Sequence, residues 1–235
     1  MRITIDTAVV DIDGTLVDSS YHQVLAWSRA FAVLHVPVDS WRLHQHMGMG
    51  GDRLVSAVAG EAVEARSGDE LREHWRRNYD ELISEVRPLD GAGELMDGLA
   101  EKGLKVVIAS SGKPEHTDRA MQLVGIDRRF PSTDSEDADA TKPAPDLVSA
   151  AVEKVEGTKA VMIGDTVWDV KAAAECGFPT IALLTGGIAR STLREAGAIV
   201  FESPRHLLNH LDDALEAAAR AGTVSERSLR VVHDE

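Results

Sequence analysis

Five short apolar runs constrain the fold of this chain more than any other feature, because each is bounded by glycine, serine, aspartate or proline. They occupy residues 8–12, 104–109, 160–163, 180–184 and, more weakly, 198–201. Continuous rather than alternating apolar residues are typical of strands covered on both faces, as in a parallel sheet. With 43% apolar residues among 235, the chain can bury such a sheet in one large domain that also carries a substantial insertion.

Helical patterns lie between the apolar runs. They cover residues 93–101, 146–155 and 170–175, and a further segment begins at Ser203. Ser203 suits the N-cap of that last helix, Pro204 suits its first position, and Gly222 is expected to lie beyond its end. Strands that alternate with helices predict an α/β fold, with a parallel sheet, helices on both faces and right-handed crossovers.

The stretch between the first two predicted strands is different. From residue 18 to residue 87 no strand-like run occurs, and apolar residues recur at helical spacing. This is far longer than the roughly dozen residues that a crossover needs. We therefore expect an all-helical second domain (18–87) inserted into a core made of 1–17 and 88–222. A loosely held C-terminal tail (223–235) is expected to follow.

Charge and composition exclude several classes of function. The formal net charge of −14 disfavours nucleic-acid binding, which depends on lysine and arginine neutralising phosphates. The sequence shows no signal-peptide pattern and no apolar run long enough to cross a bilayer. Cys176 is the single cysteine, so no disulfide can form within the chain. We expect a cytoplasmic protein that binds neither nucleic acid nor membrane; its oligomeric state cannot be deduced from the sequence.

Polar side chains cluster where the predicted strands end. In an extended chain, residues two apart point to the same face, so Asp11 and Asp13 repel each other unless a cation or a proton intervenes. Ligands of open parallel sheets bind outside the carboxyl ends of the strands, so polar residues at these ends should converge on one point. The residues concerned are Asp11 and Asp13, Ser110 and Ser111, Lys142, and Asp165 and Asp169.

This set of residue types points to phosphoryl transfer. Clustered carboxylates suit Mg²⁺, a hard cation that binds oxygen and substrate phosphate, and Mg²⁺ would neutralise Asp11 and Asp165. A carboxylate can attack phosphorus to give an aspartyl-phosphate, and the carboxyl of Asp13 can protonate the leaving oxygen. Ser110 and Lys142 can hold the phosphoryl oxygens. We therefore expect the partner to be a small phosphorylated metabolite.

Four sequence motifs resemble those of the haloacid dehalogenase superfamily, in particular its phosphatase-like members. They are "DIDGTLVDS" (11–19), "VVIASSGKP" (106–114), "KPAPD" (142–146) and "MIGDTVWDVKAAAECG" (162–177), in that order. The resemblance extends from residue 8 to about residue 211. It implies a Rossmann-like core with a helical cap of the C1 type inserted after the first motif.

The resemblance also implies roles for individual residues. Asp11 would be the nucleophile and Asp13 the general acid and base. The metal would be held by the carboxylates of Asp11 and Asp165 and by the backbone carbonyl of Asp13, with Asp169 acting directly or through water. Ser110 and Lys142 would bind the phosphoryl group. Apart from the resemblance, Ser111 is a candidate to share phosphate binding with Ser110, because it directly follows it.

Several branches of the superfamily can be tested against the residues. The dehalogenase branch lacks the second aspartate of the first motif, whereas Asp13 is present here. The phosphonoacetaldehyde hydrolase branch needs a lysine in the cap, but Lys102 is the first lysine of the chain. The β-phosphoglucomutase branch carries a cap histidine and a cap arginine, and an ungapped alignment places Gln23 and Gly51 at those positions. These departures favour a phosphatase, similar in general appearance to phosphoglycolate phosphatases.

Two other functions stay open at this stage: a sugar phosphate mutase and a non-catalytic phosphate-binding protein. Structural roles are possible for single residues as well. Ser110 could cap the following helix, and Asp169 could lie at a helix N-terminus because the helix dipole favours it there. His44 and His46 could be a metal pair, but we expect them to be exposed cap residues because no third ligand lies near them in the sequence.

Overall fold

The computed structural model describes residues 5–127, 129–137 and 140–231. Its core is a six-stranded sheet with the order β3-β2-β1-β4-β5-β6, in which every neighbouring pair is parallel. All five predicted strands are confirmed, and β3 is an additional strand of two residues that no apolar run announces. The strands are β1 (Thr7–Val10), β2 (Lys105–Ala109), β3 (Ser132–Thr133), β4 (Ala160–Gly164), β5 (Thr180–Leu183) and β6 (Ile199–Phe201).

Helices cover both faces of the sheet, as the continuous apolar runs predict. Side chains alternate along β1, so Ala8 and Val10 join the apolar cluster of one face and Val9 joins that of the other. The first cluster includes α5 (Ala92–Glu101), α6 (Pro114–Val124), α10 (Pro204–Asn209) and α11 (Leu211–Val231). The second includes α7 (Asp146–Lys154) and α8 (Val167–Glu175). A 3₁₀ turn, Leu184–Gly186, follows β5, and α9 (Arg190–Glu195) precedes β6.

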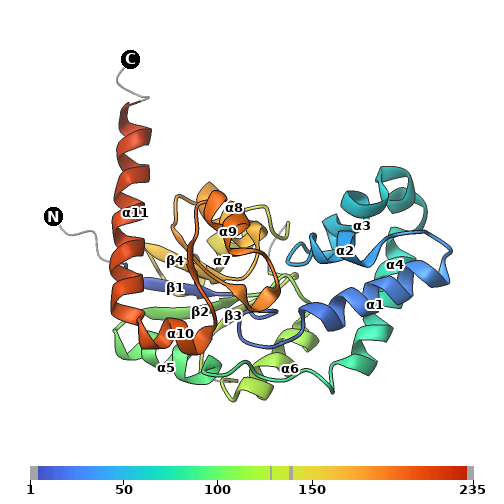
Figure 1. Cartoon of the computed structure of the whole chain (residues 1–235), viewed down its shortest axis with the longest axis horizontal. Helices are drawn as coiled ribbons and strands as arrows, with labels where there is room; N and C mark the ends of the chain where they lie inside the picture. The colour runs from blue at the N-terminus through green and yellow to red at the C-terminus, as the bar shows by residue number, and fades with distance from the viewer. Residues whose placement is uncertain (1–4, 128, 138–139, 232–235) are drawn as a thin grey trace.

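Of the five helices between β1 and β2, the first four form a separate layer, at the right of Figure 1. They are α1 (Ser20–Val33), α2 (Ser40–His44), α3 (Gly51–Ala59) and α4 (Glu61–Leu82). They have their own apolar core, with Trp27 and Phe31 from α1 packed against Leu54 and Leu71. The two chain connections to the sheet lie side by side, because Val17 pairs with Pro88. We therefore propose that 18–87 is a cap and that 1–17 and 88–222 form the core.

The C-terminal part departs from the sequence prediction in two ways. A break at His210 divides the helix that begins after Ser203 into α10 and α11. Ser203 caps α10 as expected, since its hydroxyl accepts a hydrogen bond from the backbone N–H of His206. Gly222 does not end α11, which continues to Val231, so the expected tail is helical as far as that residue. Residues 232–235 lie outside the described part of the chain.

No helix within the described ranges is both long and apolar enough to cross a membrane.

Asp6 ties the start of β1 to the loop before β4. Its carboxylate accepts hydrogen bonds from the backbone N–H groups of Thr158 and Lys159, at 3.2 and 2.9 Å, and from two threonine hydroxyls. Burial raises the pKa of Asp6, but the Thr158 and Lys159 hydrogen bonds outweigh that effect and lower the pKa below its usual value.

We expect Asp6→Ala to lower the free energy of unfolding by about 1–2 kcal/mol at pH 7, because it leaves backbone donors unpaired. The loss should shrink as the pH falls below the usual carboxyl pKa of 3.8, because Asp6 is then protonated in the unfolded wild type while it stays ionised in the folded protein, and this destabilises the wild type. Urea unfolding at several pH values measures this. Asp118→Ala, an exposed change on α6, is the control; an equal loss in both variants contradicts the expectation.

Candidate active site

Asp11 lies directly after β1, in the middle of the sheet. Its backbone N–H donates to the carbonyl of Ile163 in β4 at 2.9 Å, and its side chain is buried. Gly14 then allows the chain to turn sharply, with a φ of 77°. A side chain at Gly14 would collide with the carboxylate of Asp165, as would one at Gly186. These two glycines let the backbone approach Asp165 closely from two sides.

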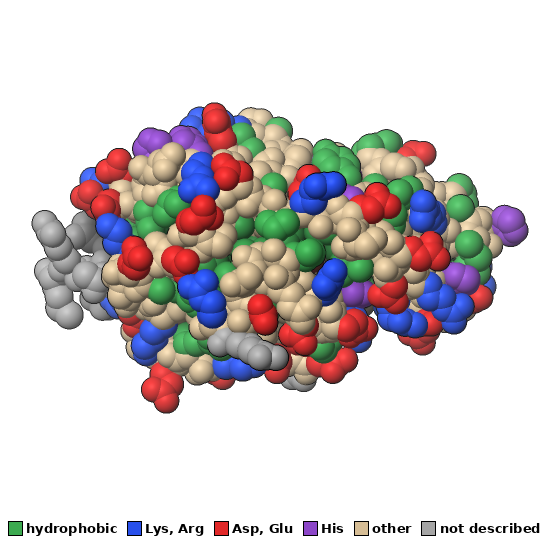
Figure 2. Space-filling model, turned by 90° about the horizontal axis from the view of Figure 1, so that it is seen from below, with side chains coloured by type: hydrophobic (Ala, Val, Ile, Leu, Met, Phe, Trp, Pro, Cys, Tyr) green, Lys and Arg blue, Asp and Glu red, His purple; other side chains and the backbone are tan. Residues whose placement is uncertain are grey.

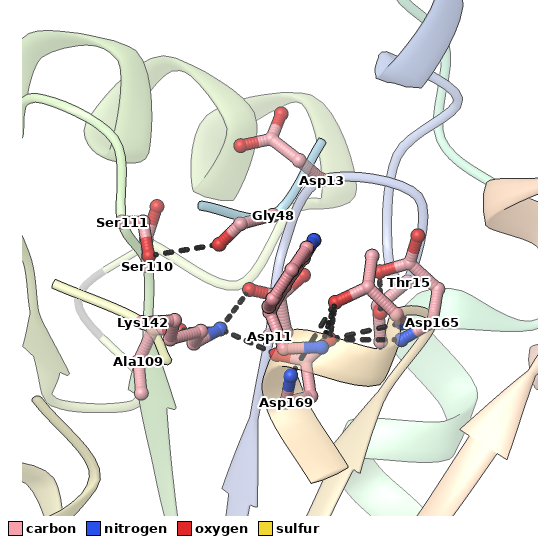
Figure 3. A network of polar contacts seen from close by, with 12 residues as sticks. Asp11, Asp13, Thr15, Gly48, Ala109, Ser110, Ser111, Lys142, Asp165 and Asp169 are labelled. Atoms are coloured by element: carbon pink, nitrogen blue, oxygen red, sulfur yellow. Dashed lines mark hydrogen bonds and ion pairs between the residues drawn. The ribbon is translucent and has the colours of Figure 1, made fainter. Parts of the chain in front are cut away.

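Lys142 lies beside Asp11 and is fully buried, with 0% of its surface exposed. Its ammonium lies 2.5 Å from Oδ1 of Asp11 and 2.7 Å from Oδ1 of Asp169. It also donates to the carbonyl of Ala109, at the end of β2, at 3.0 Å. The sequence prediction that Lys142 converges with the aspartates is therefore matched by the geometry (Figure 3).

Asp169 has structural partners for both of its carboxylate oxygens. While Oδ1 faces Lys142, Oδ2 accepts hydrogen bonds from the backbone N–H and the hydroxyl of Thr166, at 3.0 and 2.7 Å. Thr166 and Asp169 form a capping box at the start of α8. The helix-terminus role considered from the sequence is thus present, and the same side chain also holds Lys142.

The cluster is crowded with negative charge. Asp11, Asp165 and Asp169 each place one carboxylate oxygen within 4.8 Å of the others, and all three are buried. Burial is the main cause that raises the pKa of Asp165 well above its usual value, and the charges of Asp11 and Asp169 add to it. Burial likewise raises the pKa of Asp11, despite the attraction of Lys142. One ammonium does not balance three buried carboxylates, so the site favours binding of a further cation.

Asp13 points away from this cluster, toward the helical layer (Figure 3). Its Oδ1 accepts a hydrogen bond from the hydroxyl of Ser19 at 2.5 Å. The hydroxyl of Tyr79, from α4, lies close to Ser19, Gln23 and Asp13. Burial is the largest cause that raises the pKa of Tyr79, and the nearby Asp13 charge contributes. Tyr79 could not be found from the sequence, because it lies outside the four motifs.

The two serines after β2 have different surroundings. Ser110 is buried, and its hydroxyl oxygen accepts a hydrogen bond from the backbone N–H of Gly112 at 3.0 Å, which leaves the hydroxyl hydrogen free to donate. Ser111 instead donates to the carbonyl of Gly48, in the loop after α2, at 3.3 Å (Figure 3). Ser111 therefore joins the core to the helical layer.

A pocket opens between the sheet edge and the helical layer. Asp11, Asp13 and Asp165 lie on its floor, and residues from the helical layer, including Trp27 and Trp75, complete its lining. Its volume is about 40 Å³, so it is small enough for a phosphoryl group rather than for a whole metabolite.

The sequence prediction of exposed histidines is wrong. His44 and His46 are both half-buried between the helical layer and the core. Nε2 of His44 lies 2.8 Å from the carbonyl of Gly186, and its ring stacks on Tyr21. The His46 ring stacks near Trp168 of α8. Each imidazole contacts a core residue from the helical layer, and neither belongs to the carboxylate cluster.

Comparisons with known proteins agree with this geometry. The sequence model of haloacid dehalogenase-like hydrolases matches residues 5–177. The chain is 25% identical over 222 residues to the N-acetylmuramic acid 6-phosphate phosphatase of Pseudomonas aeruginosa, covering 91% of this chain and 98% of that protein. It is 30% identical over 202 residues to the phosphoglycolate phosphatase of Caulobacter vibrioides, covering 82% and 84% of the two chains. Among solved structures, a hydrolase from Pseudomonas syringae superimposes with a TM-score of 0.85 and 33% identity, covering 88% of this chain and 98% of that one.

Proposed function

Since the chain belongs to the haloacid dehalogenase-like hydrolases, we propose that it is a Mg²⁺-dependent phosphatase that hydrolyses small phosphomonoesters through an aspartyl-phosphate at Asp11. One observation carries the proposal: Asp11 and Asp165 share a buried site with Lys142, while Asp13 stands apart beside the same pocket. A nucleophile, a cation site and a separate proton donor are the three parts that such a hydrolysis requires.

The residues present fit a magnesium ion. The carboxylate cluster offers oxygen ligands only, which this hard cation prefers. Burial raises the pKa of Asp11 and Asp165 despite the charge of Lys142, so a further cation would favour their ionised forms. In the proposed site the carboxylates of Asp11 and Asp165 and the backbone carbonyl of Asp13 would hold the ion. Bound Mg²⁺ would draw negative charge off the phosphoryl oxygens.

Asp169 is not among the proposed metal ligands. Both of its oxygens are occupied by Lys142 and Thr166, so we assign it to positioning Lys142 and the start of α8. Lys142 in turn holds Oδ1 of Asp11 at 2.5 Å, which leaves Oδ2 of Asp11 to attack phosphorus. Ser110 donates its hydroxyl hydrogen to a phosphoryl oxygen, and Lys142 faces the same group as a fixed positive charge.

The proposed reaction then runs in two steps, formation of the aspartyl-phosphate and its hydrolysis. Oδ2 of Asp11 bonds to phosphorus as the bond to the leaving oxygen breaks, and Asp13 gives its proton to that oxygen. Asp13 next takes a proton from water, which attacks phosphorus and breaks the Asp11–phosphorus linkage. Inorganic phosphate leaves, Asp11 is a carboxylate again and Asp13 is protonated. The hydrogen bond from Ser19 holds Asp13 in place for both transfers.

The pocket lining favours hydrolysis over the mutase alternative. Gln23 and Gly51, which stand where the mutase branch has a histidine and an arginine, both line the pocket. Arg53, the nearest arginine in the sequence, is exposed and lies 3.9 Å from the carboxylate of Asp52. The intermediate is therefore left to water, not returned to a sugar.

The proposed function is tested by phosphate release from a panel of phosphomonoesters, including phosphoglycolate, hexose 6-phosphates and para-nitrophenyl phosphate. We expect turnover of at least one compound with Mg²⁺, its loss in excess EDTA and its return when Mg²⁺ is restored. Mg²⁺ alone should also raise the melting temperature of the wild type, and this shift should be lost in Asp165→Asn because a ligand is missing. Phosphate release that continues unchanged in EDTA contradicts the metal assignment, and no release from any compound contradicts the phosphatase.

A further inference from the structure

A second pocket adjoins the first, between the helical layer and the loops that follow β2 and β3. Its volume is about 450 Å³, within the range of sites that enclose small metabolites. Gly51, Trp75 and Ser111 line both pockets, so the two cavities are neighbours across these three residues. A phosphomonoester whose phosphoryl group sits at Asp11 would therefore extend its leaving group past Trp75 into the second pocket.

The charges in this second pocket are already compensated. Its basic side chains are Arg72, Arg76 and Lys113, and its acidic ones are Asp52, Asp69 and Glu73. Within the described lining each basic group has an acidic partner: Arg72 lies 2.8 Å from Glu64, Arg76 lies 3.0 Å from Glu73, and Lys113 lies 3.8 Å from Glu136. Figure 2 shows acidic and basic side chains intermingled over the helical layer, at the right of the view.

This charge pattern disfavours an anionic leaving group. A second carboxylate, such as the one in phosphoglycolate, would meet acidic side chains and would have to compete for cations that are already paired. Neutral hydroxyl groups, in contrast, can donate to these carboxylates and accept from the guanidinium groups without disturbing the ion pairs.

Two polar groups of the lining have no hydrogen-bond partner among the described residues. The hydroxyl oxygen of Ser135 and the indole nitrogen of Trp75 are both buried, and neither makes a hydrogen bond with another described residue. Buried polar groups are nearly always paired, so unpaired ones beside a cavity mark positions where a ligand supplies the partner.

We propose that the second pocket holds the leaving group of the substrate, and that this group is a neutral, polyhydroxylated ring of about the size of a monosaccharide. This inference rests on the proposed phosphatase function and names its substrate class. The hydroxyl groups of this ring pair with Ser135 and with the acidic side chains that α4 contributes to the lining, Asp69 and Glu73. The phosphoryl group meanwhile lies at Asp11 in the smaller pocket.

The test is a comparison of kcat/KM for hexose 6-phosphates and phosphoglycolate in the wild type and in two variants of Ser135. We expect the better hexose 6-phosphate to be preferred over phosphoglycolate by roughly 100-fold, because only the hexose fills the second pocket. Ser135→Ala should reduce this preference about tenfold through the lost hydrogen bond. Ser135→Phe should reduce it further by occupying the pocket.

Ser191→Ala, an exposed serine on α9, is the matched control and should leave the preference unchanged. Ser135→Ala removes a hydroxyl that no described residue uses, so its folding is expected to be normal even if the larger Phe side chain disturbs the loop. A wild type that prefers phosphoglycolate overturns this inference but leaves the phosphatase intact, as does a Ser135→Ala variant with unchanged preference. No hydrolysis of any phosphomonoester overturns both.

Discussion

Asp11→Asn should lower kcat for phosphate release by at least about 10³-fold, because an amide cannot attack phosphorus in place of the carboxylate. The substitution keeps the size of a buried side chain and removes one of three crowded carboxylates, so the fold should persist. Steady-state phosphate release measures the first expectation, and circular dichroism with thermal unfolding measures the second.

The control for this variant is Asp97→Asn, which removes a carboxylate from the surface of α5 where it pairs with Arg129. That variant should retain wild-type turnover. A folded Asp11→Asn protein with near-normal activity would show that another group is the nucleophile and would remove the basis of the mechanism.

Lys142→Met should lower the free energy of unfolding by about 3–5 kcal/mol in the absence of Mg²⁺. The ammonium is fully buried and lies within 2.7 Å of both Asp11 and Asp169, so its removal leaves two buried carboxylates without their cation. Lowering the pH should reduce the difference in the free energy of unfolding between the wild type and Lys142→Met. Burial already raises the pKa of Asp11, and protonation removes its charge from the variant site.

Lys102→Met is the matched control, since Lys102 pairs with Asp212 on the surface, with 42% of the lysine side chain and 79% of the aspartate side chain exposed. Exposed pairs contribute only about 0–1 kcal/mol, so this change should be much milder. Denaturant unfolding of both variants in EDTA gives the comparison. An equal effect for the two lysines contradicts the idea that Lys142 holds the carboxylate cluster together.

Much of the fold could be predicted because the strands are short, buried and bounded by turn residues. The convergence of Asp11, Lys142 and Asp165 also follows from the sequence, since the carboxyl ends of parallel strands share one edge. β3 was missed because two residues, Ser132 and Thr133, carry no periodicity. The end of α11 was misplaced because a glycine inside a helix costs only about 1 kcal/mol and ends it only where the chain turns left-handed.

The contacts between the helical layer and the core could not be predicted. His44 meets Gly186, and Tyr79 reaches Asp13 and Ser19, across long stretches of sequence. Such contacts depend on how the two layers sit together, and local spacing carries no information about that arrangement. The second pocket is of the same kind, because Trp75 and Ser135 approach each other only once the helical layer lies over the core.

The most direct test of the central claim is a search for the phosphorylated aspartate itself. The wild type, Asp13→Asn and Asp11→Asn are mixed with Mg²⁺ and radiolabelled acetyl phosphate, quenched in acid, and digested. We predict a hydroxylamine-sensitive phosphoryl group on the peptide that contains Asp11. It should reach higher occupancy in Asp13→Asn, where hydrolysis is slowed, and be absent in Asp11→Asn. Phosphate release without any label on that peptide in Asp13→Asn, or label on a different residue, would contradict the account.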